Sequence, residues 1–340
     1  MCKLDLDDFH QIISNTQPNI CQAAIVKKGK LIYSDTWNGY DLNDTVHIAS
    51  ATKSVVSLLV GIAIDKGYID SVEQHILDFF PEYTLKRGEK TLPFIKIKHL
   101  LSMTAPYKYK SEPWTKICGS DDWVKSALDL TGGKSGITGK FQYSTLGIHI
   151  ISGIIAKCSH LSMLDFANKY LFEPLNIEKR ERYFAINRQN HISFIKEKKS
   201  QGRKWICDAK GNAAAGFGLC MSAADMAKIG QLCVENGKYN GKTIVSESWL
   251  EQVLMLHSST EINSQKMQYG YLWWIINDDE KIYAAIGDSG NIIYIDIKNM
   301  IVVAIASTFK PSVHDRITFI QHNILPYVKD SNVFSTSYCR

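Results

Sequence analysis

Short apolar runs separated by turn residues lie near both ends of the chain and predict strands of one sheet. Near the start, Ala23–Val26 and Leu31–Ser34 flank the turn Lys27-Lys28-Gly29-Lys30, a pattern typical of a β-hairpin. The last third contains further runs rich in β-branched and aromatic residues: Tyr271–Ile276, Ile282–Ile286, Ile292–Ile295 and Ile301–Ser307. Because turn residues separate these runs, they predict an antiparallel meander.

The apolar residues between these ends recur at helical spacing. Ser50 to Lys66 is expected to form a buried helix, because apolar residues cover most of its circumference and Gly67 ends it. Five more helices with long connections are expected from about 70 to 200, over Val72–Phe80, Ile97–Met103, Asp121–Leu130, Gly147–Lys157 and Ser162–Tyr170. Two later helices are expected over Met221–Asn236 and Ile317–Val328.

This order of elements predicts an α/β fold of the α+β type. We expect an antiparallel sheet built from both chain ends and flanked by helices, with a mostly helical subdomain inserted between them. The 340 residues would form a single domain, with 1–68 and 240–340 in the sheet part and 69–239 in the helical insert. A chain of this length buries a sizeable core without needing disulfides or a structural metal.

Composition and charge exclude several classes of protein. Hydrophobic residues at 45% and charged residues at 21% are ordinary for a globular chain and exclude wholesale disorder. The net charge of +5 comes with a dense basic stretch at 196–204, but no nucleic-acid-binding motif accompanies it, so we expect no nucleic-acid partner. Eight cysteines without a CxxC pair and ten histidines without metal spacing predict reduced thiols, no metal and no cofactor.

The apolar segments do not predict a membrane protein. The longest apolar run, Val55–Ile64, is too short to span a bilayer. The N-terminus is acidic and has no apolar core of the kind that signal peptides carry. We therefore expect a cytoplasmic protein with no membrane contact, whose oligomeric state the sequence leaves open.

One Ser-x-x-Lys pattern has a context that suggests chemistry. Of three such pairs, Ser50/Lys53, Ser193/Lys196 and Ser307/Lys310, only Ser50 opens a long apolar helix. Residues three apart share a helix face, so the Lys53 amine can reach the Ser50 hydroxyl and act as its base. Burial would lower the pKa of the lysine, and the helix N-terminus would favour an oxyanion. Taken alone, the pair favours a simpler interpretation, a capping serine followed by a lysine that extends to solvent.

Further segments of the chain favour the catalytic interpretation of Ser50 and Lys53. Residues 47–54 resemble the nucleophile segment of the serine β-lactamase and penicillin-binding-protein superfamily, and are most similar to the class C branch that includes esterases and nylon-oligomer hydrolases. Other segments resemble this family in its own order: 97–105, 141–145, 170–177, 205–249 and 269–274. The resemblance covers roughly 20–330. It implies a β-lactamase/transpeptidase-like fold, with Ser50 as nucleophile, Lys53 as base and Tyr143 as acid/base partner.

The sequence departs from the superfamily pattern in two motifs. Thr145 stands where an asparagine is usual, although the nylon-hydrolase-like branch also tolerates Tyr-Ser-Thr. Ala285 replaces the usual cationic residue of the third motif, so no side chain there is suited to anchor a substrate carboxylate. The resemblance implies an oxyanion hole made by the backbone N–H groups of Ser50 and Asp288. Candidate cleft residues are Thr145, Gly287, Ser289 and Trp274.

These observations lead to a functional hypothesis with two alternatives. The chain is expected to be a metal-free serine hydrolase that acts on a small-molecule ester or amide through an acyl-enzyme on Ser50. One alternative is a catalytically silent member of the family with a binding or structural role. The other is a penicillin-binding D-peptidase or a β-lactamase, which fits poorly with a cytoplasmic location. The Asp288 side chain is expected to be a solvated turn residue or to attract a cationic group of the substrate.

Overall fold

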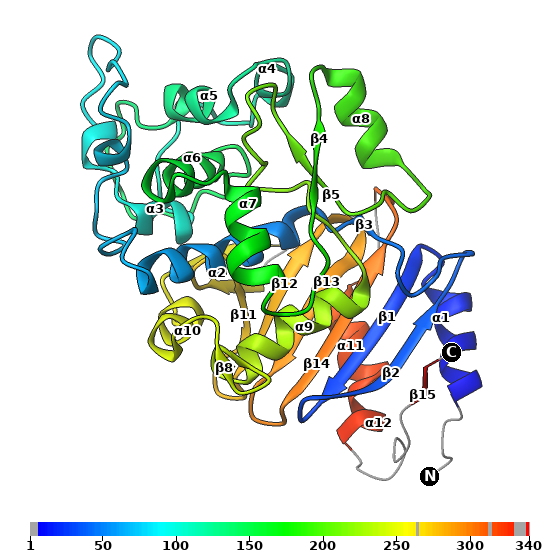
Figure 1. Ribbon diagram of the computed structural model, residues 1–340. Helices are drawn as coiled ribbons and strands as arrows, with labels where there is room; N and C mark the ends of the chain where they lie inside the picture. The colour runs from blue at the N-terminus through cyan, green and yellow to red at the C-terminus, as the bar shows by residue number, and fades with distance from the viewer. Residues whose placement is uncertain (1–5, 263–264, 312–314, 330–337, 340) are drawn as a thin grey trace.

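The computed structural model describes residues 6–262, 265–311, 315–329 and 338–339. At its centre is a nine-stranded sheet with the order β15-β2-β1-β14-β13-β12-β11-β10-β9 (Figure 1). The strands are β1 Ile20–Lys27, β2 Lys30–Thr36, β9 Ser258–Ile262, β10 Gln265–Tyr269, β11 Trp274–Asn277, β12 Ile282–Gly287, β13 Asn291–Asp296, β14 Ile301–Ser307 and β15 Tyr338–Cys339. Neighbouring strands are antiparallel except for β15, which pairs with β2 in parallel. The predicted antiparallel sheet built from both chain ends is confirmed.

Helices cover both faces of this sheet. Successive residues of a strand point to opposite faces, and here both sets are apolar and need to be buried. On β14, Ile301, Val303 and Ile305 belong to the core under α1 (Leu6–Thr16), α11 (Arg316–Asn323) and α12 (Leu325–Lys329). The alternate residues Val302, Ala304 and Ala306 belong to the larger core, which contains α2 (Thr52–Asp65) and α9 (Ala223–Val234). Strand β14 therefore contributes to two separate cores.

A second group of helices lies on the far side of α2 from the sheet (Figure 1). These helices are α3 Ile97–Leu101, α4 Trp114–Cys118, α5 Trp123–Leu130, α6 His149–Ser159, α7 Met163–Ala167 and α8 Arg188–Lys196. Short strand pairs accompany them: β3 Val46–His47 with β6 Cys220–Met221, and β4 Glu181–Phe184 with β5 Lys204–Cys207. Between α9 and β9 the chain forms the strand pair β7 Lys238–Tyr239 with β8 Lys242–Thr243, and then helix α10 (Glu247–Leu254). Helix α9 packs on the sheet although it precedes residue 240.

Several predicted elements differ in the structure. The helix expected over Val72–Phe80 is wrong, since only the 3₁₀ turn Ile76–Phe79 forms there. The backbone of residues 72–76 instead bonds across to residues 95–98, which leaves it unavailable for a helix. The helix expected over Ile317–Val328 is divided at Ile324 into α11 and α12, where Pro326 lacks the N–H that a continuous helix needs.

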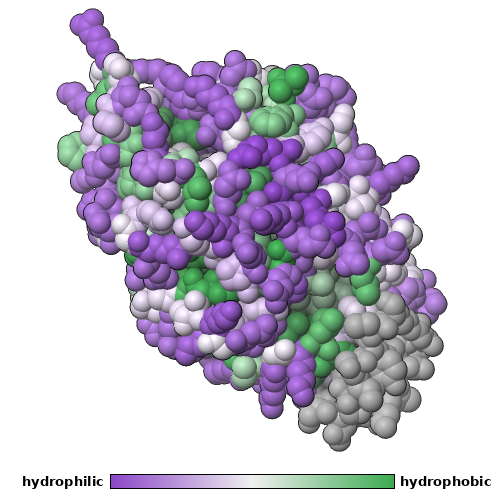
Figure 2. Space-filling view, viewed as in Figure 1, coloured by the Kyte–Doolittle hydropathy of each residue, from purple (hydrophilic) through white to green (hydrophobic). Residues whose placement is uncertain are grey.

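The surface is mainly hydrophilic, and apolar side chains form small separate patches on the face in Figure 2. The most exposed large apolar side chains are those of Phe94 and Ile186, each 65% exposed. Within the described ranges, no single helix is long and apolar enough to cross a membrane. Two consecutive helical segments, His149–Ser159 and Met163–Phe172, reach the length and apolar composition of a membrane span only when taken together, and they are bent by 74° relative to each other.

Helix α2 is buried along most of its length and is held by close contacts. All residues from Thr52 to Ala63 are buried. The indole of Trp249 lies directly against Gly61, where an added Cβ would come within 2.1 Å of Cδ1. Trp249 also donates from Nε1 to the Ser57 carbonyl at 3.1 Å. The absence of a side chain at Gly61 therefore sets how closely α10 and α2 pack.

Replacing Gly61 by alanine tests this packing. The substitution ordinarily stabilises a helix by about 1 kcal/mol. Here we expect a loss of about 1–3 kcal/mol in the free energy of unfolding, because the new methyl group overlaps the indole. Urea denaturation checks the sign. In a Trp249→Leu background the same substitution should cost much less, and an equal cost in both backgrounds would show that the indole is not the obstacle.

Candidate active site

Ser50 and Lys53 lie together at the start of the buried helix. Ser50 is the middle residue of a 3₁₀ turn, Ala49–Ala51, that leads directly into α2. Ala49 has a φ of 49°, a left-handed conformation that residues other than glycine rarely adopt, and the chain turns there from β3 into the helix. Lys53 is 1% exposed and its Nζ lies 2.9 Å from Ser50 Oγ. The lysine is therefore fully inside the protein and does not extend to solvent.

The other neighbours of the Lys53 amine are uncharged hydrogen-bond acceptors. Nζ lies 2.7 Å from the Gly216 carbonyl oxygen and 3.1 Å from Thr145 Oγ1. Within the described ranges, no carboxylate forms an ion pair with it. A neutral amine has two N–H groups and one lone pair, and a carbonyl can only accept. In the neutral form, an amine that donates its two N–H groups to Gly216 and Thr145 would have its lone pair left for the Ser50 hydroxyl.

Tyr143 lies beside this pair through its ring. Lys53 Nζ is 4.8 Å from the ring centroid, within the range of a cation–π contact. The half-buried ring stacks on Trp274 at a centroid distance of 6.3 Å and an angle of 14°. No hydrogen bond of the Tyr143 hydroxyl is found to any residue that the structure describes. Trp274 therefore packs against Tyr143, and neither of the two is among the residues that line the pocket next to Ser50.

The end of strand β12 approaches the same helix start. A Cβ on Gly287 would lie 2.2 Å from the Ile48 carbonyl oxygen, so only glycine permits this contact. The next residue, Asp288, begins the 3₁₀ turn Asp288–Gly290. The first N–H groups of a helical turn have no partner within it, and both Ser50 and Asp288 occupy such positions. Ala285, two residues before Gly287 on the same strand, is buried and offers no cation.

Buried amides hold the turn that carries Asp288. Asn291 donates to the Asp288 carbonyl at 2.9 Å and accepts from the Ser307 N–H at 2.9 Å. Asn19 donates to the Ser289 carbonyl at 2.7 Å. The Ser289 hydroxyl is bonded to the backbone of Lys310, so this side chain stabilises the turn at the pocket wall. The Asp288 side chain is exposed at the pocket rim.

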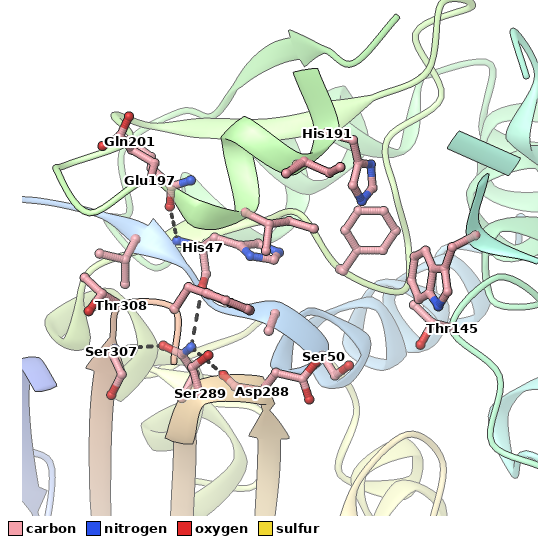
Figure 3. A pocket seen from close by; sticks show the side chains of 18 of the residues that line it. His47, Ser50, Thr145, His191, Glu197, Gln201, Asp288, Ser289, Ser307 and Thr308 are labelled. Atoms are coloured by element: carbon pink, nitrogen blue, oxygen red, sulfur yellow. Dashed lines mark hydrogen bonds between the residues drawn. The ribbon is translucent and has the colours of Figure 1, made fainter. Parts of the chain in front are cut away.

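A pocket of about 410 Å³ opens over Ser50 and Thr145. Its walls are mainly apolar and aromatic, with side chains from α4, α8 and two loops: Trp114, His191, Ile192, Ile195, Phe217 and Phe309. In Figure 3, Ser50 and Thr145 lie at one end of the view, and Gln201 and Thr308 lie at the other. The charged residues of its lining are Arg188, Glu197 and Asp288. The pocket thus joins a polar centre at Ser50 to a largely apolar chamber.

Three histidines surround the Phe217 ring, with centroid distances of 6.3 Å for His47, 5.5 Å for His149 and 5.0 Å for His191. Burial lowers the pKa of His47 to about 3, and repulsion from His191 and Lys53 adds to the effect. Burial likewise lowers the pKa of His149 to about 3, with Lys53 and His191 adding to it. Burial alone lowers the pKa of His191 to about 4. All three imidazoles are therefore neutral at physiological pH and add no charge to the chamber.

The structure brings most of the candidate residues together. Thr145 contacts Lys53, and Gly287 and Asp288 lie against the start of the helix; Ser289 and Trp274 act as supports. His149, four residues after Thr145, could from the sequence line the cleft or lie in the core or at the surface, and it is 1% exposed. Residues 216–218 belong to a segment that resembles the family, but the sequence did not predict that the Gly216 carbonyl contacts Lys53 or that three histidines surround Phe217. In the described ranges, no group of three or more His, Cys, Asp and Glu side chains could hold a metal ion.

Comparison with known proteins agrees with the family resemblance seen in the sequence. Residues 21–322 match the family model described as Beta-lactamase. The 6-aminohexanoate-dimer hydrolase of Paenarthrobacter ureafaciens is 22% identical over 311 residues, which cover 86% of this chain and 72% of that protein. A penicillin binding protein from Bacillus halodurans has a TM-score of 0.69 and 15% identity, over 92% of this chain and 98% of its own. A family VIII carboxylesterase has a TM-score of 0.67 and 14% identity, over 92% and 94%.

The class of protein is thus a hydrolase of the serine β-lactamase-like type. More particularly, the chain belongs to the Beta-lactamase family, whose model spans most of it. The resemblance seen in the sequence is confirmed, and so is the β-lactamase/transpeptidase-like fold that it implied.

The buried histidines predict acid sensitivity. An unfolded chain protonates His191 below the ordinary pKa of 6.5, whereas the folded protein keeps it neutral down to about 4. The unfolded state therefore binds more protons in this window, and stability falls as pH drops from about 6.5 towards about 4. Replacing His191 by asparagine should reduce that slope by up to about 1.4 kcal/mol per pH unit in urea titrations. An unchanged slope would mean that His191 is not held neutral.

Proposed function

We propose that this protein hydrolyses small-molecule esters or amides through an acyl-enzyme on Ser50. The observation that carries the proposal is the 2.9 Å contact between Lys53 Nζ and Ser50 Oγ, made by an amine whose two other polar contacts are acceptors. A serine hydroxyl is a weak nucleophile until a base removes its proton. Lys53 is the base, and its lone pair takes the Ser50 proton as Oγ attacks the substrate carbonyl carbon.

The remaining steps follow from the groups around this pair. Attack converts the carbonyl oxygen into an oxyanion, which accepts hydrogen bonds from the N–H groups of Ser50 and Asp288. One such donor typically contributes about 10²–10³-fold to the rate. As the tetrahedral intermediate collapses, the leaving group takes a proton through Tyr143 and departs, and the acyl group stays on Ser50. Water then attacks the ester carbon of the acyl-enzyme. Its oxygen becomes part of the released carboxylic acid, and its proton restores the Ser50 hydroxyl.

The substrate class rests on the site and on the relatives together. A relative is named a 6-aminohexanoate-dimer hydrolase and a structural neighbour a carboxylesterase, so amides and esters are the candidate bonds. The buried Ala285 provides no cation for the carboxylate of a β-lactam or a peptide. The apolar chamber suits an uncharged organic group next to the reacting carbonyl. These features favour an esterase or small-amide hydrolase over a D-peptidase.

Ser50→Ala is the direct test of the nucleophile. We expect turnover of p-nitrophenyl esters to fall by about 10³-fold or more, because the attacking atom is gone. Stability should barely change, since only one hydroxyl is removed. A fluorophosphonate probe should add a single mass adduct on Ser50 of the unaltered protein.

The matched control is Ser193→Ala, which removes the serine of an exposed Ser-x-x-Lys pair. This variant should keep full activity and full labelling. A folded wild-type protein that takes up no probe would instead support a catalytically silent protein with a binding role.

The missing cation predicts weak activity on β-lactams. With Ala285 in the third motif and the shorter Thr145 in the second, nitrocefin turnover should be poor relative to a short-chain ester. Both substrates can be compared by kcat/KM under the same conditions. A nitrocefin value of roughly 10⁶ M⁻¹s⁻¹ or more, typical of an efficient enzyme, would contradict this reasoning and favour a β-lactamase.

A further inference from the structure

The orientation of Lys53 depends on a four-residue loop, residues 215–218. Its Gly216 carbonyl is the closest acceptor of the lysine amine, at 2.7 Å. A carbonyl accepts only, so its position decides where one N–H of the amine points and hence where the lone pair points. Any displacement of this loop would leave the lone pair free to turn away from Ser50.

Two imidazoles, of the buried His149 and the partly buried His47, accept the N–H groups of Ala215, just before Gly216, and of Gly218, two residues after it. His149 Nδ1, on α6, accepts from the Ala215 N–H at 3.2 Å. His47 Nε2, on β3, accepts from the Gly218 N–H at 2.9 Å. The two histidines are far apart in the sequence and reach the loop from different elements. Each bond requires that the accepting ring nitrogen carry no proton.

Steric contacts fix the loop's position, and a hydrogen bond from the Ile206 N–H to the Gly218 carbonyl at 3.0 Å holds its last peptide group, but neither holds the peptide groups around Gly216. A Cβ on Gly216 would lie 2.3 Å from the Thr145 carbonyl oxygen, so the loop packs directly on the segment that carries Thr145. Gly218 has a φ of 92°, and a Cβ there would overlap Ile206. Two glycines so close together leave the peptide planes free to rotate. The imidazole bonds limit that rotation, because they hold the N–H groups of Ala215 and Gly218 at the two ends of the segment that carries the Gly216 carbonyl.

We propose that His47 and His149 are positioning residues that hold the Gly216 carbonyl against Lys53, and thereby direct the lysine lone pair at Ser50. The proposal rests on the role of Lys53 as base in the proposed function. It assigns the tautomers: His47 carries its proton on Nδ1, and His149 carries its proton on Nε2. A misplacement of about 1 Å at a reacting group can cost about 10²-fold in rate, so the two histidines would affect catalysis without contacting substrate.

Matched pairs of variants separate hydrogen bonding from packing. The side-chain oxygen of glutamine can replace an accepting Nε2, and that of asparagine can replace an accepting Nδ1. His47→Gln and His149→Asn therefore keep an acceptor, whereas His47→Leu and His149→Leu remove it. The measurement is the rate at which a fluorophosphonate modifies Ser50, with folding checked by circular dichroism and thermal unfolding. His322, exposed on α11, receives the same substitutions as a control.

We expect the leucine variants to lose about 10–100-fold in labelling rate and the glutamine and asparagine variants to stay within a few fold of wild type. The His322 variants should label at the wild-type rate. Folded leucine variants that label at the wild-type rate would overturn the proposal. So would folded glutamine and asparagine variants that lose as much as the leucine ones, because an acceptor alone would then not suffice.

A second readout does not depend on activity or on the leucine variants being folded. Long-range ¹H–¹⁵N spectra of the imidazoles, assigned with the conservative variants, report which ring nitrogen carries the proton. The proposal requires an Nδ1–H tautomer for His47 and an Nε2–H tautomer for His149, and any other result overturns it. If the wild-type protein does not label at Ser50 at all, the proposed function fails, while the tautomers still show whether the loop is held in this way.

Discussion

The buried amine of Lys53 is the constraint on which the site depends. Removing an ammonium group from water costs several kcal/mol, and here no carboxylate among the described residues compensates for that cost. Only dipoles surround the amine: two hydroxyls, one carbonyl and the face of an aromatic ring. These contacts hold the amine at one place, 2.9 Å from Ser50 Oγ. The buried helix, the loop at Gly216 and the segment at Thr145 are all needed to build them.

Three separate parts of the chain meet around Ser50. The turn Ala49–Ala51 and helix α2 supply Ser50 and Lys53, the segment before α6 supplies Tyr143 and Thr145, and the turn after β12 supplies Asp288. Two of these contacts allow no side chain at all, since Gly287 touches the backbone at Ile48 and Gly216 touches the backbone at Thr145. Backbone packed this closely cannot shift without disturbing its neighbours. The positions of these candidate residues are therefore set by closely packed elements, as the proposed function requires of groups that must be aligned together.

Local patterns were sufficient for the strongly periodic elements. The runs of the last third became β12, β13 and β14, and the helix beginning at Ser222 is capped by that serine, whose side chain accepts from the Asp225 N–H. Prediction failed where partners far along the chain competed for the backbone, as at residues 72–76, which bond to residues 95–98. Tyr271–Ile276 shows a smaller difference, because Leu272 has a φ of 63° and β11 begins only at Trp274. Such long-range contacts have no local signature.

The sequence by itself determined the class of fold, the family and the likeness of Ser50, Lys53 and Tyr143 to a catalytic set, because these depend on periodicity and on motifs in a fixed order. Only the tertiary structure decided what surrounds the lysine. Gly216 and Thr145 accept from it, and His47 and His149 hold the loop, yet these residues are spread over some 170 positions of the chain. Hydrogen bonds between such distant residues exist only after the helices and the sheet have packed, so no local pattern of side chains could encode them.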